Sequence, residues 1–435
     1  MRRKTVGARK EKVKVEKALK MMPGMVVDGR LIVQETSYGG FYGDDGHGKI
    51  YVESKTPTQF DPAIAAKVNP GSYFKSSVYT GADPEIFVVD ANGIIIPAFS
   101  FLPSQKKGIK TNIRYWGGPA PLIYNDGFQA EYTVPPECCH SAMVDDIRLQ
   151  MKAILHRAKE FDKKARLSTD NTMDIPMDLM MATAEEHTVL GCAPSVNAYG
   201  LKGEPIADGR AIPMRWCGWH VHIGGVAQEM KHPEVANHAA KACDLFSGIA
   251  AIALFGDKER KERRRYYGMP GEYRLPDHGF EYRPISGMMG YHPVWVQFLL
   301  DVTRWAYRMG VSRLYEAHGK FSEKDVIAAI INSDVDAARG IIKENKKVWQ
   351  SFMEARYKPG QYSYAPTKYR GDEMMEVLLG RAKIKDAGSV EKNWKLNKGE
   401  FNCSCDNIKI EEYDGPDWIT HAESANCSVG RMVLE

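Results

Sequence analysis

The feature that most constrains the fold is a segment in the middle of the chain in which two histidines alternate with apolar residues. Residues 218–225 read GWHVHIGG and place His220 and His222 two positions apart. Successive side chains of a β-strand point to opposite faces, so this pattern predicts a strand with both imidazoles on one face and apolar side chains on the other. Paired imidazoles could hold a metal ion or a phosphate, but surface or core histidines would give the same pattern.

Three other segments share this design. Asp83 and Glu85 lead into the apolar run 86–89, Glu131 is central on the polar face of an alternating stretch over 128–134, and Glu281 and Arg283 alternate with two aromatic residues. Each carboxylate alone is also compatible with a solvated strand end. If the four strands are neighbours in one sheet, they form a charged concave surface with packed aromatic residues and helices behind it.

Apolar residues at helical spacing predict helices between and after these strands. The helix over 143–165 is strongly amphipathic and should lie on one face of the sheet. Further helices are expected over 233–255, 293–309, 323–331, 335–356 and 373–381. The sequence therefore predicts an α+β fold with additional C-terminal helices that carry no evident chemistry.

Charge is unevenly distributed along the 435 residues. The net charge is +4, but residues 1–20 contain nine Lys or Arg and two Glu, so the remaining residues sum to −3. The body is therefore not a basic nucleic-acid binder, and contact with nucleic acid is expected only through the arm 1–20. No apolar run long enough for a signal peptide or membrane span follows the arm, which favours a soluble cytoplasmic protein without membrane contact. A homo-oligomer is compatible with the sequence.

The eight cysteines are scattered, and reduced thiols suit a cytoplasmic location. Cys403, Cys405 and Cys427 form only a weak zinc pattern. Cys192 has no evident base nearby, so a structural role is favoured over a nucleophilic one.

A basic run over 258–265 opens directly into a Gly-rich turn that ends at Arg274. Such a run is usually a solvated face, but here it could wrap guanidinium groups around a polyphosphate, with a nucleic-acid backbone as the competing anion. Carboxylates with one histidine suit Mg²⁺ or Mn²⁺. Together, the acidic, histidine and arginine residues indicate nucleotide-dependent phosphoryl or acyl transfer.

Six motifs occur in a fixed order over about residues 78–310: GADPEIF, NDGFQAEY, GCAP, WHVHIG, RYYGMPGEYR and GFEYRPIS. In this order they resemble the phage-encoded carboxylate–amine ligases (amidoligases), a branch of the glutamine synthetase and γ-glutamylcysteine ligase superfamily. The resemblance implies a glutamine synthetase-like fold, in which a curved antiparallel sheet forms an active-site funnel and helices pack on its outer face. It also implies a bacteriophage origin and the host cytoplasm as the location.

The resemblance further implies roles for individual residues. The superfamily often has a glutamate where this chain has Asp83, which leaves open whether Asp83 is a ligand. His222 would lie near the nucleotide, and Arg265 and Arg274 would hold the ATP phosphates. Arg283 would hold the substrate carboxylate or its acyl phosphate, and Glu281 and Arg274 would act with it in catalysis. The implied metal ligands are Glu85, Glu131, His220 and Glu281.

The implied reaction has two steps and requires ATP and Mg²⁺ or Mn²⁺. ATP phosphorylates a small-molecule or peptide carboxylate, and an amine then attacks the acyl phosphate to form an amide or isopeptide bond. The sequence identifies neither substrate, nor the base that deprotonates the amine.

The expected organisation is a basic arm (1–24), a small β unit and linker (25–76), a catalytic domain (77–311), a helical part (312–399) and a Cys-containing tail (400–435). Two other functions are compatible with the sequence. A metal-dependent hydrolase could use the His-x-His pair without ATP, but it would give the arginines no role. A non-enzymatic phage or nucleic-acid-associated protein would use the basic arm and bind in a strongly salt-dependent manner.

Overall fold

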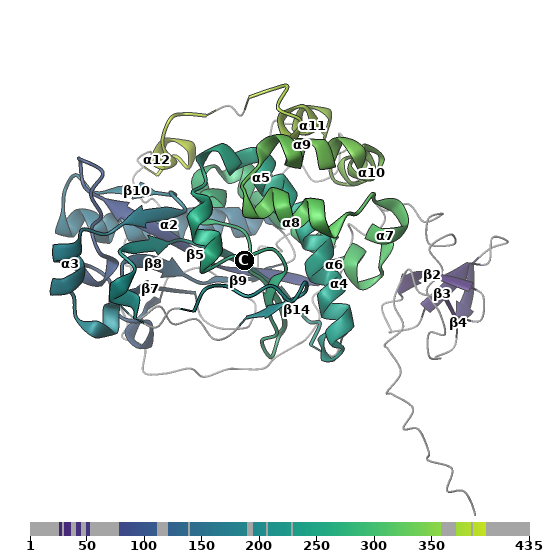
Figure 1. Ribbon diagram of the computed structural model, residues 1–435, viewed down its shortest axis with the longest axis horizontal. Helices are drawn as coiled ribbons and strands as arrows, with labels where there is room; N and C mark the ends of the chain where they lie inside the picture. The colour runs from purple at the N-terminus through teal and green to yellow at the C-terminus, as the bar shows by residue number, and fades with distance from the viewer. Residues whose placement is uncertain are drawn as a thin grey trace, which may run out of the picture. The chain divides into compact units, whose positions relative to one another are not determined.

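The computed structural model contains two compact units, Met1–Ala65 and Ala66–Glu435 (Figure 1). In the first, the backbone is described at 26–27, 30–35, 41–44 and 49–52. In the second, the described residues are 78–110, 121–137, 140–188, 195–205, 208–227, 229–357, 371–383 and 386–396. At 141 and 142 the description covers the backbone alone. The predicted basic arm, Cys192 and the cysteines of the tail lie outside these residues.

The first unit contains a four-stranded antiparallel sheet in which each strand pairs with the next along the chain. Its strands are β1 (Val26–Val27), β2 (Arg30–Glu35), β3 (Phe41–Asp44) and β4 (Lys49–Val52).

The second unit is built on a ten-stranded sheet whose central strand is β5 (Tyr79–Val89). The strand order is β12-β15-β16-β14-β5-β8-β7-β6, and β9 and β10 also pair with β5. Every pairing of named strands in this sheet is antiparallel among the described residues. The other strands are β6 (Ile109–Lys110), β7 (Leu122–Asp126), β8 (Gln129–Tyr132), β9 (Val134–Glu137), β10 (Arg166–Ser168), β12 (Val196–Asn197), β14 (Trp219–Gly224), β15 (Glu272–Arg274) and β16 (Gly279–Tyr282).

Helices cover the apolar face of this sheet, which confirms the predicted α+β class. Helix α2 (His140–Phe161) contacts β5 and β9, α4 (Pro233–Cys243) contacts β16, and α6 (Pro293–Val311) contacts β14. The side chains that β14 and β16 direct to this face are at most 1% exposed: Trp219, Val221, Ile223, Phe280 and Tyr282. The alternation in the sequence therefore separates a packed face from a polar one.

The remaining helices extend the core beyond α6. In Figure 1, α8 (Glu323–Ile331), α9 (Val335–Glu344), α10 (Lys346–Arg356) and α11 (Gly371–Leu378) gather at the end of this unit away from β7 and β8. Smaller elements are α3 (Met177–Ala182), α5 (Ile249–Phe255), α7 (Leu314–His318), α12 (Val390–Asn393) and a separate pair of strands, β11 (Thr172–Asp174) and β13 (Met214–Trp216).

Two predicted helices are interrupted. The helix expected over 233–255 contains a π-helical turn, Asp244–Gly248, where Asp244 Oδ1 accepts a hydrogen bond of 2.6 Å from Tyr282 on the sheet. The helix expected over 335–356 is divided at Asn345, whose side chain binds the backbone of Lys320. In both cases a tertiary hydrogen bond to a polar side chain accompanies the departure from regular α-helix.

The apolar segment Pro233–Lys258 is long enough to cross a membrane, but 89% of its most apolar window is buried inside the protein. Burial of this kind is typical of a core helix.

The first predicted strand also differs from the structure. The sequence places Asp83 and Glu85 before a strand that starts at Ile86, whereas β5 starts at Tyr79 and includes both carboxylates. The sequence over 90–96, an Asp-Ala-Asn-Gly turn followed by three isoleucines, is typical of a hairpin, but the structure has only one bridge there, between Val89 and Ile95. Pro97 follows directly and has no N–H with which to continue a ladder.

Candidate functional site

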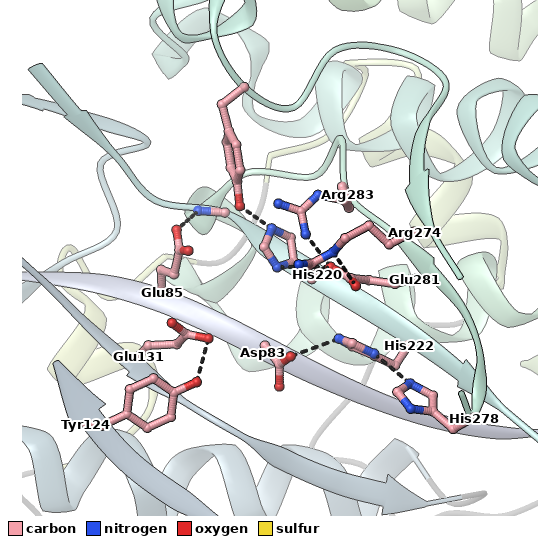
Figure 2. Close-up of polar contacts among 12 residues, drawn as sticks. Asp83, Glu85, Tyr124, Glu131, His220, His222, Arg274, His278, Glu281 and Arg283 are labelled. Atoms are coloured by element: carbon pink, nitrogen blue, oxygen red, sulfur yellow. Dashed lines mark hydrogen bonds and ion pairs between the residues drawn. The ribbon is translucent and has the colours of Figure 1, made fainter. Parts of the chain in front are cut away.

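The register of the sheet brings the predicted polar residues together on one face. Glu85 on β5 lies opposite Glu131 on β8, and Asp83 lies opposite His220 on β14. The polar residues continue across the next two strands. His222 lies opposite Glu281 on β16, and Glu281 lies opposite Arg274 on β15. Figure 2 shows these side chains from five adjacent strands turned toward a common space.

Three carboxylates form an acidic cluster at the β5–β8 side. Glu85, Asp126 and Glu131 each offer an oxygen, and the three oxygens lie within 4.8 Å of one another. Glu85 is buried and accepts a hydrogen bond of 2.6 Å from the Gly218 N–H. Glu131 accepts one of 2.7 Å from the hydroxyl of Tyr124, whereas Asp126 is exposed at the end of β7. Two of the three carboxylates are therefore held in place by donors, and the third is open to solvent.

The acidic cluster disfavours full ionisation. Burial and repulsion from Asp126 raise the pKa of Glu85 to about 8. Burial, followed by repulsion from Asp126 and Glu85, raises the pKa of Glu131 well above its usual value. Like charges at this separation cannot all be present without a compensating cation. Oxygen donors of this kind are the ligands that Mg²⁺ and Mn²⁺ prefer.

The structure divides the predicted metal ligands into two groups. Glu85 and Glu131 lie in the acidic cluster together with Asp126, which strand alternation does not mark as a ligand. The sequence signal for Asp126 is its place in the Asn-Asp-Gly turn directly before the polar-faced strand that carries Glu131. His220 and Glu281 do not belong to this cluster of three.

Glu281 is instead enclosed by cations. Its oxygens accept hydrogen bonds of 2.8 Å from Arg274 Nε, 2.5 Å from Arg274 Nη2, and a further one from Arg283 Nη1. Glu281 and Arg283 are at most 2% exposed. The carboxylate therefore holds two of the predicted catalytic arginines in one place by charge-assisted hydrogen bonds.

His220 lies between Glu85 of the acidic cluster and Glu281 (Figure 2), and it is neutral. Its Nδ1 is 3.5 Å from Glu281 Oε1, and its Nε2 shares a short hydrogen bond with the hydroxyl of Tyr267. Burial and the neighbouring Arg283 and Arg274 hold the pKa of His220 well below its usual value.

Buried arginines from the basic run extend the cationic side of the site. Arg263 is fully buried and donates 2.7 Å to the Pro284 carbonyl, while its Nε and Nη1 have no hydrogen-bond partner among the described residues. The guanidinium groups of Arg263 and Arg283 lie 6.0 and 5.3 Å from the centre of the Tyr267 ring. Burial and repulsion from Arg264 lower the pKa of Arg263 to about 10, so it remains positively charged at neutral pH.

Arg265, the residue expected from this run by sequence, is exposed and lies elsewhere. Its Nε and Nη2 donate 2.9 and 3.0 Å to the two oxygens of Glu204. Its predicted contact with ATP phosphates remains a prediction.

Asp83, His222 and His278 form a third set of contacting residues. His222 Nε2 is 2.9 Å from Asp83 Oδ2, and His222 Nδ1 is 2.9 Å from Nε2 of His278, a residue that no sequence motif singles out (Figure 2). Burial opposes ionisation of Asp83, but attraction to His222 outweighs it and lowers the pKa of Asp83. His222 is thus at ion-pair distance from Asp83 through Nε2 and shares a hydrogen bond with His278 through Nδ1.

No protein-family model matches the sequence, and no curated protein matches it. Among solved structures, the chain is similar to a bifunctional glutathione synthetase from Pasteurella multocida, with 11% identity and a TM-score of 0.32. That match covers 77% of this chain and 52% of the synthetase, so the chain spans about half its length. A novel glutamine synthase homolog is 12% identical with a TM-score of 0.31, over 80% of this chain and 78% of the other. At these values the similarities identify neither the fold family nor the activity of this chain.

Proposed function

We propose that the chain is an ATP-dependent carboxylate–amine ligase that forms an amide or isopeptide bond through an acyl phosphate. The observation that carries this proposal is the juxtaposition of an acidic cluster and buried guanidinium groups on one face of one sheet. Divalent cations and arginines are the two means by which proteins neutralise a transferring phosphoryl group. The ordered motifs that resemble the amidoligases support the same reaction.

The acidic cluster fits a Mg²⁺ or Mn²⁺ ion. Glu85, Asp126 and Glu131 would hold it through three carboxylate oxygens, a donor set that suits a hard cation and whose mutual repulsion it would relieve. When bound, the ion would neutralise charge on phosphoryl oxygens. We assign the ion to this cluster; the other predicted ligands, His220 and Glu281, contact Tyr267 and the arginines instead.

The cationic side would bind the transferred phosphoryl group and the substrate carboxylate. Arg274 and Arg283 carry two positive charges against the single carboxylate of Glu281, and Arg263 adds a third. The unpartnered nitrogens of Arg263 and the planar guanidinium of Arg283 suit anionic oxygens. His220, being neutral, can donate or accept a proton in a hydrogen bond without adding charge.

In the proposed reaction a substrate carboxylate oxygen attacks the γ-phosphorus of ATP and ADP leaves. An amine then attacks the carbonyl carbon, the bond to the phosphate oxygen breaks, and the nitrogen loses a proton. The arginines would orient both anions and stabilise the charge that develops on them. A funnel-shaped sheet, a small-molecule or peptide substrate, a phage origin and a host-cytoplasmic location belong to the same proposal.

The test is phosphate release from ATP by the purified full-length protein with Mg²⁺ or Mn²⁺, across pools of amino acids and cell-wall peptides. We expect release that requires both a carboxylate and an amine, and that Asp126→Asn abolishes. Glu160→Gln, at an exposed position of α2, is the matched control and should retain it. Hydrolysis of a peptide or ester without ATP would instead favour the metal-dependent hydrolase. Absence of ATP binding, with salt-dependent nucleic-acid binding, would favour the non-enzymatic protein.

A further inference from the structure

We infer that Tyr267 is a positioning residue that sets the two buried arginines Arg263 and Arg283 with the face of its ring. This inference rests on the proposed function, in which both arginines bind anionic oxygens of the reacting groups. Tyr267 belongs to the motif RYYGMPGEYR and lies between the 3-10 helix Lys261–Arg265 and β15, where strand alternation does not mark it.

The ring of Tyr267 is the group that the two guanidinium groups share. The Cζ atom of Arg283 lies 5.3 Å from the ring centre and that of Arg263 lies 6.0 Å from it, and all three side chains are buried. The negative face of an aromatic ring attracts a cation, most strongly when both groups are removed from water. Glu281 accepts a hydrogen bond from Arg283, whereas Arg263 donates to the Pro284 carbonyl. The ring therefore opposes the mutual repulsion of the two cations and fixes their separation.

Tyr267 is itself held in one orientation. Its hydroxyl shares a short hydrogen bond with His220 Nε2, and its ring stacks on Trp216 with the ring centres 6.0 Å apart. Its backbone N–H donates 2.8 Å to the carbonyl of Arg263, one turn earlier on the chain. A ring with a fixed hydroxyl, a fixed face and a fixed backbone can hold other side chains in place.

Two glycines give the ring and Arg263 the space that they occupy. A Cβ at Gly218 would lie 2.7 Å from the hydroxyl oxygen of Tyr267, and a Cβ at Gly268 would overlap the guanidinium group of Arg263. The N–H of Gly218 is also the donor that holds Glu85 of the acidic cluster. Tyr267 is therefore packed against the same backbone position that orients the acidic cluster, and it places the arginines at a set distance from that cluster.

The arrangement predicts which part of Tyr267 matters most. Arginines that stabilise a transferring phosphoryl group must be placed accurately, because a displacement of about 1 Å can reduce the rate by about 100-fold. The contact with the arginines needs only an aromatic ring, which phenylalanine supplies and leucine does not.

The activity test compares Tyr267→Phe with Tyr267→Leu in the full-length protein. The reaction is phosphate release from ATP with Mg²⁺ and the carboxylate and amine found in the screen described above. We expect Tyr267→Leu to lower kcat by about 100-fold and to change KM for ATP by less than about 3-fold, because the arginines act on the transferred group. Tyr267→Phe should restore kcat to within about 10-fold of wild type. Equal loss in the two variants, or no loss in Tyr267→Leu, would overturn the inference.

Tyr266 provides the matched control. It stacks on the same Trp216, with the ring centres 5.6 Å apart, and the guanidinium group of Arg265 lies 5.7 Å from its ring centre. Arg265 is paired with Glu204 outside the site, so Tyr266→Leu removes a similar pair of contacts without moving the buried arginines. It should retain kcat, and a loss equal to that of Tyr267→Leu would overturn the inference.

A second measurement needs no substrate and does not depend on the folding of the leucine variant. In full-length protein labelled with ¹⁵N-arginine, NMR should show the side-chain signals of Arg263 and Arg283 shifted by the ring current of Tyr267. The shifts should be retained in Tyr267→Phe. Unshifted signals in wild type, or shifts lost in Tyr267→Phe, would overturn the inference. Shifted signals in a wild-type protein that shows no ATP-dependent reaction would instead count against the proposed function.

Discussion

Glu281 shows how a single buried carboxylate can organise the site. It neutralises Arg274 and Arg283, so its replacement leaves two cations facing each other in a buried environment. We expect Glu281→Gln to lower the free energy of unfolding by about 3 kcal/mol, because breaking a buried ion pair leaves an uncompensated charge. Urea denaturation measures this value. Glu160→Gln should change it by less than about 0.5 kcal/mol, and equal effects of the two substitutions would contradict the role assigned to Glu281.

Substitution of Asp126 tests whether the divalent cation binds at the acidic cluster. Because Asp126 is exposed, Asp126→Asn should leave stability nearly unchanged while removing one of three charged ligands. We expect the affinity for Mn²⁺ to fall by about 10-fold or more. Titration monitored by electron paramagnetic resonance measures it, with Glu160→Gln as the control. Unchanged affinity would place the ion elsewhere.

Sequence reasoning locates the site residues on strands but not every residue that contacts the site. Strand alternation selects Glu85, Glu131 and Glu281, and pairing places them on one face. Alternation does not report which residues of a basic run are buried, and here these are Arg263 and Arg264 rather than Arg265. Asp126 and the loop residue His278 lie at strand ends, where no periodicity marks them.

At the scale of elements, the β7–β8 hairpin positions Asp126. Gly127 follows it with φ +61°, and a Cβ at this position would lie 2.5 Å from the carbonyl oxygen of His187. We expect Gly127→Ala to lower the free energy of unfolding by about 2–4 kcal/mol and to weaken Mn²⁺ binding, because the turn must shift away from a backbone atom.

Gly93 provides the matched control for this hairpin. It also has a positive φ, +84°, but a Cβ there would meet nothing within 4 Å. Gly93→Ala should therefore show only the cost of the left-handed backbone, about 1–2 kcal/mol, and retain metal binding. If both substitutions have the same effect on metal binding, the hairpin does not position the ligand.

Element boundaries are predicted best where periodicity is strong. Strand β14 occupies 219–224 and α6 begins at Pro293, both as the sequence indicates. The π-helical turn at Asp244 was not predictable, because it accompanies a hydrogen bond to Tyr282, 38 residues away on the chain. Similarly, β5 extends to Tyr79 because β14 and β9 pair with its first half, which local sequence does not reveal.

At the scale of the whole second unit, one buried cluster joins three helices. Asp301 on α6 is 2.6 Å from His140 on α2 and 2.5 Å from Arg356 on α10. Burial, together with Arg304, lowers the pKa of His140 to about 4. Burial opposes ionisation of Asp301, but Arg356 and His140 outweigh it, and its pKa is about 2.

These values give a pH dependence of stability with a defined sign. Unfolded His140 binds a proton below its ordinary pKa of 6.5 and the folded form does not, so stability falls as the pH drops from 6.5 to 4. The contribution of Asp301 is lost at lower pH, between 3.8 and 2. We expect His140 to account for about 3 kcal/mol across its range, at 1.36 kcal/mol per pKa unit. Denaturant unfolding should show a flatter profile for His140→Gln between pH 6.5 and 4; an unchanged profile would contradict this assignment.

The uneven charge of the whole chain predicts that nucleic-acid binding and ATP-dependent turnover belong to different parts of the chain. Residues 1–20 carry a net +7 and the remainder −3. Deletion of residues 1–20 should abolish any nucleic-acid binding, whose affinity should fall steeply with salt, and leave ATP-dependent turnover unchanged. Fluorescence anisotropy at several salt concentrations measures the first property. Binding that survives the deletion would place the nucleic-acid surface on the body.

The central claim is that the acidic cluster and the arginines together carry out ATP-dependent ligation. The most direct measurement is phosphate release from ATP with Mg²⁺, with each carboxylate pool tested in the presence and absence of an amine. We predict release that depends on both substrates and disappears in Asp126→Asn. Wild-type protein that binds neither Mn²⁺ nor ATP would contradict the claim.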